Sequence, residues 1–573
     1  MGERERMRFE ADVLDVSGMD YPQRVLAASL QGLVNRGGPR LFLDYGIYDD
    51  ESARKTNEPF LPDAIWKAKF RDAVRNQDRE NLTYYQAVYD LRLTEYADLR
   101  TVLGKYADSI HGVVVWDPDM PDSVNAALML CGLNNLVAVH PALLEWTQDM
   151  ELPVVEDLRG RWANRVALYA WAFEHLFPRC APGQVACVEP GWERPEFYDY
   201  LVQNRVFTYS LTAKAPGRRF KIGQTLLLLL VGGPPKLRRW VFELGLDGPV
   251  KTIGLGLMGW ASGETRLATR IQRAVAHAPF PTIFGWHTKR DDELSFMVHL
   301  STNGMRLVPS HLAGNFSFHS RLPLTVPLKQ DHATPKSARL EADKVYLTFT
   351  LSDGDQLMMM STGEMGNWRR PERGEVPFNW EVQPLLADLA PALLGQYFHT
   401  RTPADYLIGG PSGAGYCIPP LMPRLEDYLQ ETSDVCRRAD VRVFTSYIAD
   451  PPMRVIPHHG RAPGDFLGYL AGYLHFGQTP MRLYSGRAFV ANAWPHANQI
   501  WDDSDKVLAW VREQVESPGP TPRFIGVHLF AYRTTLKDVA EFARTLDPQR
   551  VKVVRADEFL LAAAQHMLGH RGS

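Results

Sequence analysis

The stretch Val345-Tyr-Leu-Thr-Phe-Thr-Leu351-Ser-Asp-Gly-Asp355 decides how the C-terminal part of this chain folds. Its first seven residues are apolar, aromatic or β-branched, a pattern typical of a buried strand. The polar residues Ser352 to Asp355 follow directly and are typical of a turn. We therefore expect a buried strand that carries two carboxylates, Asp353 and Asp355, just beyond its carboxyl end.

Strand and helix patterns alternate along the chain after this stretch. Strands are predicted at Tyr406–Ile408, Val441–Ile448, Arg482–Val490, Phe524–Phe530 and Val551–Val554, and helices at Val382–Leu394, Leu536–Leu546 and Glu558–Leu568. Roughly 230 residues of such alternation is the size of one (β/α) barrel, complete or lacking strands. We predict an α/β fold with a barrel-like C-terminal domain over residues 341–573. A doubly wound open sheet is the alternative, since spacing alone does not separate the two.

The N-terminal half shows the same alternation. Ile110–Trp116 and Leu136–His140 read as strands, and a helix that starts after Asp122-Ser123 lies between them. This order predicts a βαβ unit in a parallel sheet. We expect an α/β N-terminal region over residues 1–325, of one or two subdomains, and a proline-containing linker over residues 326–340.

Composition excludes several classes of protein. The 573 residues carry a net charge of −3, with 45% hydrophobic and 23% charged residues, which is typical of a globular protein without a nucleic-acid partner. The apolar run Leu226–Val231 has six residues, against the ~20 that a membrane span needs. The charged N-terminus lacks the apolar segment of a signal peptide, so we expect a cytoplasmic protein without a membrane partner. The five cysteines include no CxxC pair, so no disulfide framework or cysteine zinc site is expected.

Polar residues gather where the predicted C-terminal strands end. In (β/α) barrels these ends carry the reactive side chains. The candidate catalytic residues are Asp353, Asp355, Asp450, His528 and Asp557, and the candidate substrate-binding residues are Trp380, Gly413, Gly415, Tyr416 and Trp494. Ordinary structural roles stay open: Asp353 and Asp355 suit a turn, His528 suits a core, and Asp557 suits a helix start.

Several separated motifs resemble one known family. Phe349–Asp355, Asn379-Trp380 and Gly410-Pro-Ser-Gly-Ala-Gly-Tyr-Cys-Ile-Pro419 stand in the order found in the GxGYxYP family of putative glycoside hydrolases. Leu30-Gln-Gly-Leu-Val-Asn-Arg36 and Asn315-Phe-Ser317 are similar to its N-terminal region. The resemblance implies a sugar-processing enzyme with a barrel-like C-terminal domain. The sequence departs from the family at Ile418, where the name-giving motif has its second tyrosine.

The first functional hypothesis is glycoside hydrolysis, with a carbohydrate as the substrate and no cofactor. This reaction needs two carboxyl groups, roughly 5 Å apart for retention or 6.5–9.5 Å apart for inversion. Asp353 or Asp355 would be the nucleophile or base, with Asp450, Asp557 or Glu558 as its partner from another strand. His528 would orient a carboxylate or a sugar hydroxyl, and Trp380, Tyr416 or Trp494 would stack on sugar rings.

Two alternatives remain. A metal-dependent carbohydrate deacetylase would hold a divalent ion with Asp353 or Asp355 and with His528 or His459. A carbohydrate-binding protein without catalysis would bind sugars through the same aromatic residues. The sequence leaves the sugar, the linkage and the oligomeric state open.

Overall fold

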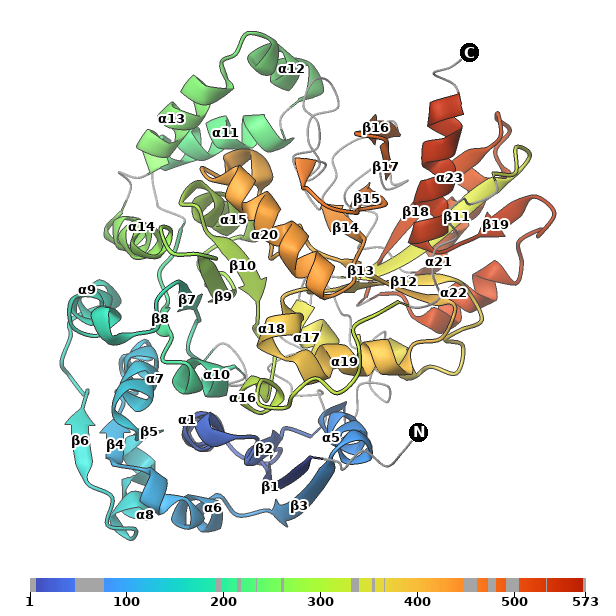
Figure 1. Cartoon of the computed structure of the whole chain (residues 1–573). Coiled ribbons are helices and arrows are strands. Elements are labelled where there is room, and N and C mark those ends of the chain that lie inside the picture. Colours follow the sequence, from blue (N-terminus) through green and yellow to red (C-terminus); the bar gives the residue numbers. More distant parts are fainter. Residues whose placement is uncertain are drawn as a thin grey trace.

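The chain is described by a computed structural model (Figure 1). It describes residues 7–46, 77–191, 197–213, 218–232, 234–258, 262–330, 340–352, 356–364, 366–446, 461–471, 481–490, 504–531 and 533–569.

The N-terminal part contains three small parallel sheets. Their strand orders are β2-β1-β3, β5-β4-β6 and β10-β9-β7-β8. The strands are β1 (Arg8–Asp15), β2 (Leu41–Asp44), β3 (Asp90–Tyr96), β4 (Gly112–Val115), β5 (Leu136–Val139), β6 (Val154–Asp157), β7 (Gln184–Cys187), β8 (Phe207–Tyr209), β9 (Thr282–Gly285) and β10 (Arg306–Pro309). The three sheets follow one another from the lower part of Figure 1 towards its centre.

The predicted βαβ unit is confirmed. β4 and β5 pair in parallel, and α7 (Ser123–Asn134) connects them. The helix ends at Asn135, whose left-handed backbone (φ 58°) terminates it. Gly132 lies inside this helix. A Cβ there would lie 2.9 Å from the carbonyl oxygen of Val202, so this glycine lets α7 pack closely on α10 (Tyr198–Gln203).

Helices surround these sheets. They are α1 (Tyr21–Val34), α5 (Gln77–Val88), α6 (Leu99–Lys105), α8 (Leu144–Gln148), α9 (Arg165–His175), α11 (Arg218–Gly232), α12 (Pro235–Glu243), α13 (Asp247–Met258), α14 (Gly263–Val275), α15 (Glu293–Thr302) and α16 (Phe316–His319). The run Leu226–Val231 lies in α11, within the group α11–α13 at the top of Figure 1. Within the described residues, no helix has both the length and the apolar character needed to cross a membrane.

The C-terminal part is built on a nine-stranded sheet. Its order is β16-β17-β15-β14-β13-β12-β11-β18, with β19 also paired to β11. The strands are β11 (Val345–Ser352), β12 (Phe378–Val382), β13 (Asp405–Gly409), β14 (Val443–Ser446), β15 (Gly468–Ala471), β16 (Arg482–Tyr484), β17 (Arg487–Val490), β18 (Arg523–Phe530) and β19 (Val551–Val553). The parallel mixed α/β architecture is as expected. Among the described strands nothing pairs the edge strand β16 with β18, so these residues show no closed barrel and the predicted barrel is not confirmed.

Two predicted elements of this part are wrong in detail. Arg482–Val490, expected as one strand, is the antiparallel hairpin β16–β17, turned at Ser485 and Gly486 with left-handed backbones (φ 51° and 80°). Val382–Leu394, expected as one helix, starts as the end of β12. It then continues as α18 (Leu386–Leu389) and α19 (Pro391–Thr400), because proline disfavours helical backbone at the residue before it.

The remaining helices are α17 (Gln356–Ser361), α20 (Leu425–Arg438), α21 (Ser504–Glu516), α22 (Leu536–Ala543) and α23 (Ala556–Gly569). The last of these, α23, covers part of one face of the C-terminal sheet. Its Phe559 and Leu560 pack with Tyr346 of β11 and Ile408 of β13 in one apolar cluster. A Cβ on Gly468 of β15 would lie 3.0 Å from Leu560, so this helix sits directly on the sheet.

Asn379 of β12 links this helix to the first strand of the sheet. Its buried amide nitrogen donates to Thr348 Oγ1 (2.8 Å) and to the carbonyl oxygen of Phe349 (2.7 Å). Its amide oxygen accepts from the backbone N–H of Ala556 (2.7 Å), the first residue of α23. One side chain thus fixes where α23 begins relative to β11 and β12.

We expect Asn379→Leu to lower the free energy of unfolding by about 3 kcal/mol, because it leaves buried donors and acceptors without partners. Urea unfolding followed by tryptophan fluorescence measures this loss. Asn204→Leu is the matched control, since the Asn204 amide bonds only to Tyr200 and Gln203 in its own turn. Equal losses in the two variants would contradict the linking role of Asn379.

Candidate functional site

Helix α23 covers one half of a face of the C-terminal sheet. The other half of that face, towards the carboxyl ends of β11, β12 and β18, carries polar side chains. The strand register places Thr350, Asn379 and His528 side by side on this face, and alternation adds Glu381 two residues further along β12. All four are buried. The same face is therefore apolar under α23 and polar towards the ends of β11, β12 and β18.

Glu381 is the carboxylate at the centre of this polar surface. Thr445 of β14 donates its hydroxyl to Glu381 Oε2 at 2.7 Å, and both side chains are buried. Between them lies Gly410 of the segment after β13, where a Cβ would lie 2.3 Å from the Glu381 carboxyl carbon. Only glycine fits there, so the backbone itself brings the two side chains together across β13.

His528 lies in the middle of β18, as its apolar sequence neighbours predict. It is paired in register with Thr350 of β11 and is 3% exposed. Burial lowers the pKa of His528 to about 3. The imidazole therefore stays neutral at any ordinary pH, a form that accepts one hydrogen bond and donates another.

Asp557 stands in the first turn of α23, directly after Ala556, and its carboxylate is paired with an arginine. It forms a paired hydrogen bond with Arg555 (3.1 and 3.0 Å), and Arg555 also donates to the carbonyl oxygen of Pro403, just before β13 begins. These contacts place the Asp557 carboxylate at the amino end of β13. They support a structural role, and we leave Asp557 out of the proposed catalytic set.

Trp380 points to the opposite face of β12. Its indole is fully buried, donates its N–H to Asp405 (2.8 Å) and packs against Trp368 with ring centroids 4.9 Å apart. A sugar ring cannot reach an indole in this environment. We therefore leave Trp380 out of the proposed substrate site.

Gly413, Gly415 and Tyr416 lie where the C-terminal part meets β10. Tyr416 forms an antiparallel bridge with Leu307, and its buried hydroxyl donates to Glu293 Oε1 at 3.0 Å. Gly415 has φ 97°, and a Cβ there would lie 3.1 Å from the carbonyl oxygen of Leu307. The name-giving motif of the resembling family thus joins two parts of this chain, and these contacts support packing rather than sugar binding.

The N-terminal motifs also form a scaffold. Gln31 donates to Asn315 Oδ1 (2.7 Å), and Asn35 donates to Ser317 Oγ (2.9 Å), in both cases through buried side chains. Asn315 in turn bonds both backbone groups of Leu43 in β2 (2.8 and 2.9 Å). These polar residues hold α1, β2 and α16 together across some 280 residues of sequence.

Four of the candidate residues lie outside the described residues: Asp353, Asp355, Asp450 and Trp494, and the same holds for His459. Their roles stay predictions. Asp353 and Asp355 follow β11, and Asp450 follows β14, with the gaps of the description beginning just after these strands.

Sequence reasoning missed Glu381 and Glu364. The helix predicted from Val382 leaves Glu381 outside any predicted strand, so the sequence gives no strand end at this residue. The signal for a strand is the short run of bulky residues Phe378–Val382, which follows Pro377. Glu364, in the segment after α17, has no sequence signal at all. It is fully buried, and neither carboxylate oxygen has a hydrogen-bond partner among the described residues.

Among the described residues no three His, Cys, Asp or Glu side chains gather in a way that could hold a metal ion. Whether the protein uses a metal stays a prediction.

Glu364 makes stability depend on pH. Burial, with Glu381 and Asp405 nearby, raises the pKa of Glu364 well above its ordinary value. Folding therefore takes up a proton above the ordinary glutamate pKa, and the stability of the folded state falls as the pH rises. We expect Glu364→Gln to raise the melting temperature, by more at about pH 8 than at about pH 5. The control Glu541→Gln changes an exposed residue on α22 and should shift little at either pH; equal shifts of the two variants would contradict this account.

Restoring the family's tyrosine tests the packing role of the motif. Ile418 is fully buried, and its backbone N–H donates to Ser301 Oγ at 2.9 Å. We expect Ile418→Tyr to destabilise the protein by about 1–3 kcal/mol through overpacking, with turnover per folded molecule unchanged. Ile418→Val, which removes one methylene, is the control and should cost about 1 kcal/mol. A gain in turnover for the tyrosine variant would place this position in the substrate site.

Comparisons with known proteins bear on the family and the fold of this chain. Residues 343–564 match the family model described as "GxGYxYP putative glycoside hydrolase C-terminal domain", and residues 110–180 match the "GxGYxYP_N second domain". The fold is similar to the crystal structure of a putative hydrolase from Bacteroides thetaiotaomicron VPI-5482, with a TM-score of 0.72 and 19% identity over 98% of this chain and 96% of that one. At that identity the likeness shows the fold alone. No curated protein sequence matches this chain. The two family matches, in the order and places that the sequence motifs indicate, show that the chain belongs to the GxGYxYP family.

Proposed function

We propose that this protein is a glycoside hydrolase whose catalytic carboxylates lie at the carboxyl ends of the strands of the C-terminal sheet. One observation carries the proposal. A single sheet face is apolar where α23 covers it and changes to buried polar side chains towards the strand ends, with the Glu381 carboxylate among them. Buried polar groups without a role in packing are costly, and family membership adds the reaction class.

Glu381 supplies the first carboxyl group. The hydroxyl of Thr445 donates to its Oε2 at 2.7 Å and holds the carboxyl group in one orientation. Gly410 fixes its position, because any side chain there would collide with the Glu381 carboxyl carbon. A carboxylate held at one place by its neighbours is suited to act on a bound sugar.

The second carboxyl group comes from a segment that follows a neighbouring strand. β11, which precedes Asp353 and Asp355, pairs directly with β12, and adjacent strands lie about 4.8 Å apart. β14, which precedes Asp450, is two strands from β12, at about twice that spacing. Retaining enzymes need roughly 5 Å between the carboxyl groups and inverting enzymes 6.5–9.5 Å, so the anomer formed first reports which separation the active pair has.

His528 has a positioning role in this scheme. It lies across β11 from Asn379 on the same face as Glu381, and it is neutral. A neutral imidazole holds a sugar hydroxyl or a carboxylate without titrating near neutral pH. The pH profile of turnover should therefore show no step of its own near the ordinary histidine pKa of about 6.5.

The test is product release from a panel of oligosaccharides and aryl glycosides. We expect Glu381→Gln to lower turnover by about 10²–10⁴-fold, since amide cannot exchange a proton or attack a sugar. Asp353→Asn, Asp355→Asn and Asp450→Asn identify the partner carboxyl, and NMR of the first-formed anomer reports retention or inversion. Glu145→Gln, on the short helix α8 of the N-terminal part, is the matched control and should leave turnover unchanged.

Three outcomes would contradict the proposal. The first is full turnover in Glu381→Gln. The second is loss of turnover on dialysis against a chelator with recovery on adding a divalent cation, which supports the metal-dependent alternative. The third is binding without any cleavage across the panel by folded wild-type protein, which supports the binding-protein alternative.

A further inference from the structure

The segment Pro279-Phe280-Pro281, just before β9, exposes an aromatic ring to solvent. Phe280 has a left-handed backbone (φ 59°), a conformation that costs energy for a bulky residue, and it is 53% exposed. Strained backbone that holds a large apolar side chain in water points to a role other than packing.

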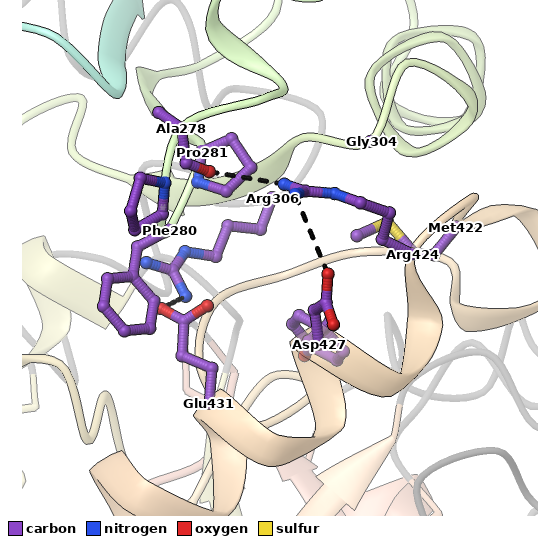
Figure 2. A pocket seen from close by; sticks show the side chains of 11 residues that line it. Ala278, Phe280, Pro281, Gly304, Arg306, Met422, Arg424, Asp427 and Glu431 are labelled. Carbon is purple, nitrogen blue, oxygen red and sulfur yellow. Dashed lines mark hydrogen bonds and ion pairs between the residues drawn. The ribbon is translucent and has the colours of Figure 1, made fainter.

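Two pockets that both include Phe280 in their lining lie near the amino ends of β9 and β10 and against α20. The smaller, shown in Figure 2, has a volume of about 180 Å³ and includes Met422, Arg424 and Asp427 in its wall. The larger has a volume of about 340 Å³ and reaches Asp388 and Arg438. The larger pocket lies within the roughly 300–1,000 Å³ that small-ligand sites occupy.

One buried ion pair, Arg306 with Glu431, lines both pockets. Arg306 bonds to Glu431 and donates to Thr282 Oγ1 (3.1 Å), and both charged residues are less than 10% exposed. The Arg306 guanidinium also lies 5.5 Å from the centre of the Phe280 ring. One face of the ring is thus held by Arg306, which fixes its orientation towards the pockets.

The charges that line the pockets cancel in pairs. Arg424 lies 3.7 Å from Asp427, and Arg438 bonds to Asp388 at 2.5 Å, in addition to the buried pair. The lining therefore offers no surplus charge to attract an anion or a cation. It offers an aromatic face together with planar guanidinium and carboxylate groups that donate to and accept from hydroxyls. A neutral ring with one apolar face and many hydroxyls matches this chemistry.

We propose that the Phe280 pockets are a second saccharide-binding site, in which a neutral sugar ring stacks on Phe280 and hydrogen-bonds to the paired charges around it. The class of ligand rests on the proposed function. The site itself is separate from the polar face of the C-terminal sheet, because it lies at the amino ends of β9 and β10.

Two residues that line this second site, Arg306 and Tyr428, contact the GxGYxYP motif at Gly415. A Cβ on Gly415 would lie 3.0 Å from Arg306 Cδ, and Tyr428, which lines the smaller pocket, donates to the carbonyl oxygen of Gly415 (2.9 Å). A saccharide bound here would therefore contact side chains that pack against the segment after β13. The proposed catalytic surface lies at the carboxyl end of that same strand.

The experiment uses the full chain and four neutral probes: maltotetraose, cellotetraose, xylotetraose and mannotetraose. Methionine labelled with ¹³C in its methyl group reports binding, because Met422 lines the smaller pocket and Met129, in α7, is a distant reference. We expect at least one probe to shift the Met422 resonance and leave Met129 unchanged. Met422→Leu assigns the signal, and calorimetry gives the dissociation constant.

Phe280→Ala should raise that dissociation constant at least about tenfold, and Phe280→Trp should keep it close to the wild-type value. Trp240→Ala is the control, since Trp240 of α12 is equally exposed and lies outside both pockets. Absence of a Met422 shift with all four probes, or equal binding by Phe280→Ala and wild type, would overturn the proposal.

The two proposals fail separately. Glu381→Gln should lose turnover and keep the Met422 shift, because Glu381 is no part of the Phe280 pockets. A Met422 shift that depends on Phe280 in a protein that cleaves no glycan would leave this site standing and overturn the proposed hydrolysis. Cleavage without any Met422 shift would do the reverse.

Discussion

The hydrogen bonds of one buried side chain, the amide of Asn379, fix where α23 begins on the C-terminal sheet. Because Asn379 bonds both β11 and the first residue of α23, the helix starts at a fixed level of the sheet and fills only the apolar half of one face. The other half of that face then has to carry the polar residues towards the strand ends. Glu381 lies two residues further along the same strand, on the same face and beyond the level at which α23 begins.

In this structure the motifs that mark the family join separate parts of the chain. Gly413, Gly415 and Tyr416 join the segment after β13 to β10, and Gln31 and Asn315 join α1, β2 and α16. Gly415 suits its place because backbone passes close to backbone there, and the amides of Asn35 and Asn315 bond to buried backbone groups that need partners. A motif of this kind holds the parts of the chain together, and the proposed catalytic carboxylate Glu381 lies on a different strand.

The sequence predicted much of the fold and little of the site. Alternation of apolar runs and turns correctly placed β11, β13, β18 and the unit from β4 to β5, because each of these strands is buried on both faces and bounded by clear turn residues. The same reasoning failed at Val382–Leu394, where a strand end, a short helix and a proline break lie within thirteen residues. Trp380 and Asp557 were chosen for their residue types, but burial and pairing with Arg555 or Asp405 are properties of the tertiary fold. Glu381 needed the register between strands, which no local pattern contains. The residues after β11 and β14, which carry Asp353, Asp355 and Asp450, stay predictions.

A crystal structure of the Glu381→Gln variant with a bound oligosaccharide tests the central claim most directly. The account predicts a glycosidic oxygen or anomeric carbon within about 3.2 Å of the residue 381 side chain, with a carboxyl group from a segment after β11 or β14 on the other side of the bond. It also predicts that Tyr416 and Ile418 stay buried and out of contact with that sugar. An oligosaccharide seated against residues 413–418, with the side chain of residue 381 out of reach of the sugar, would contradict it.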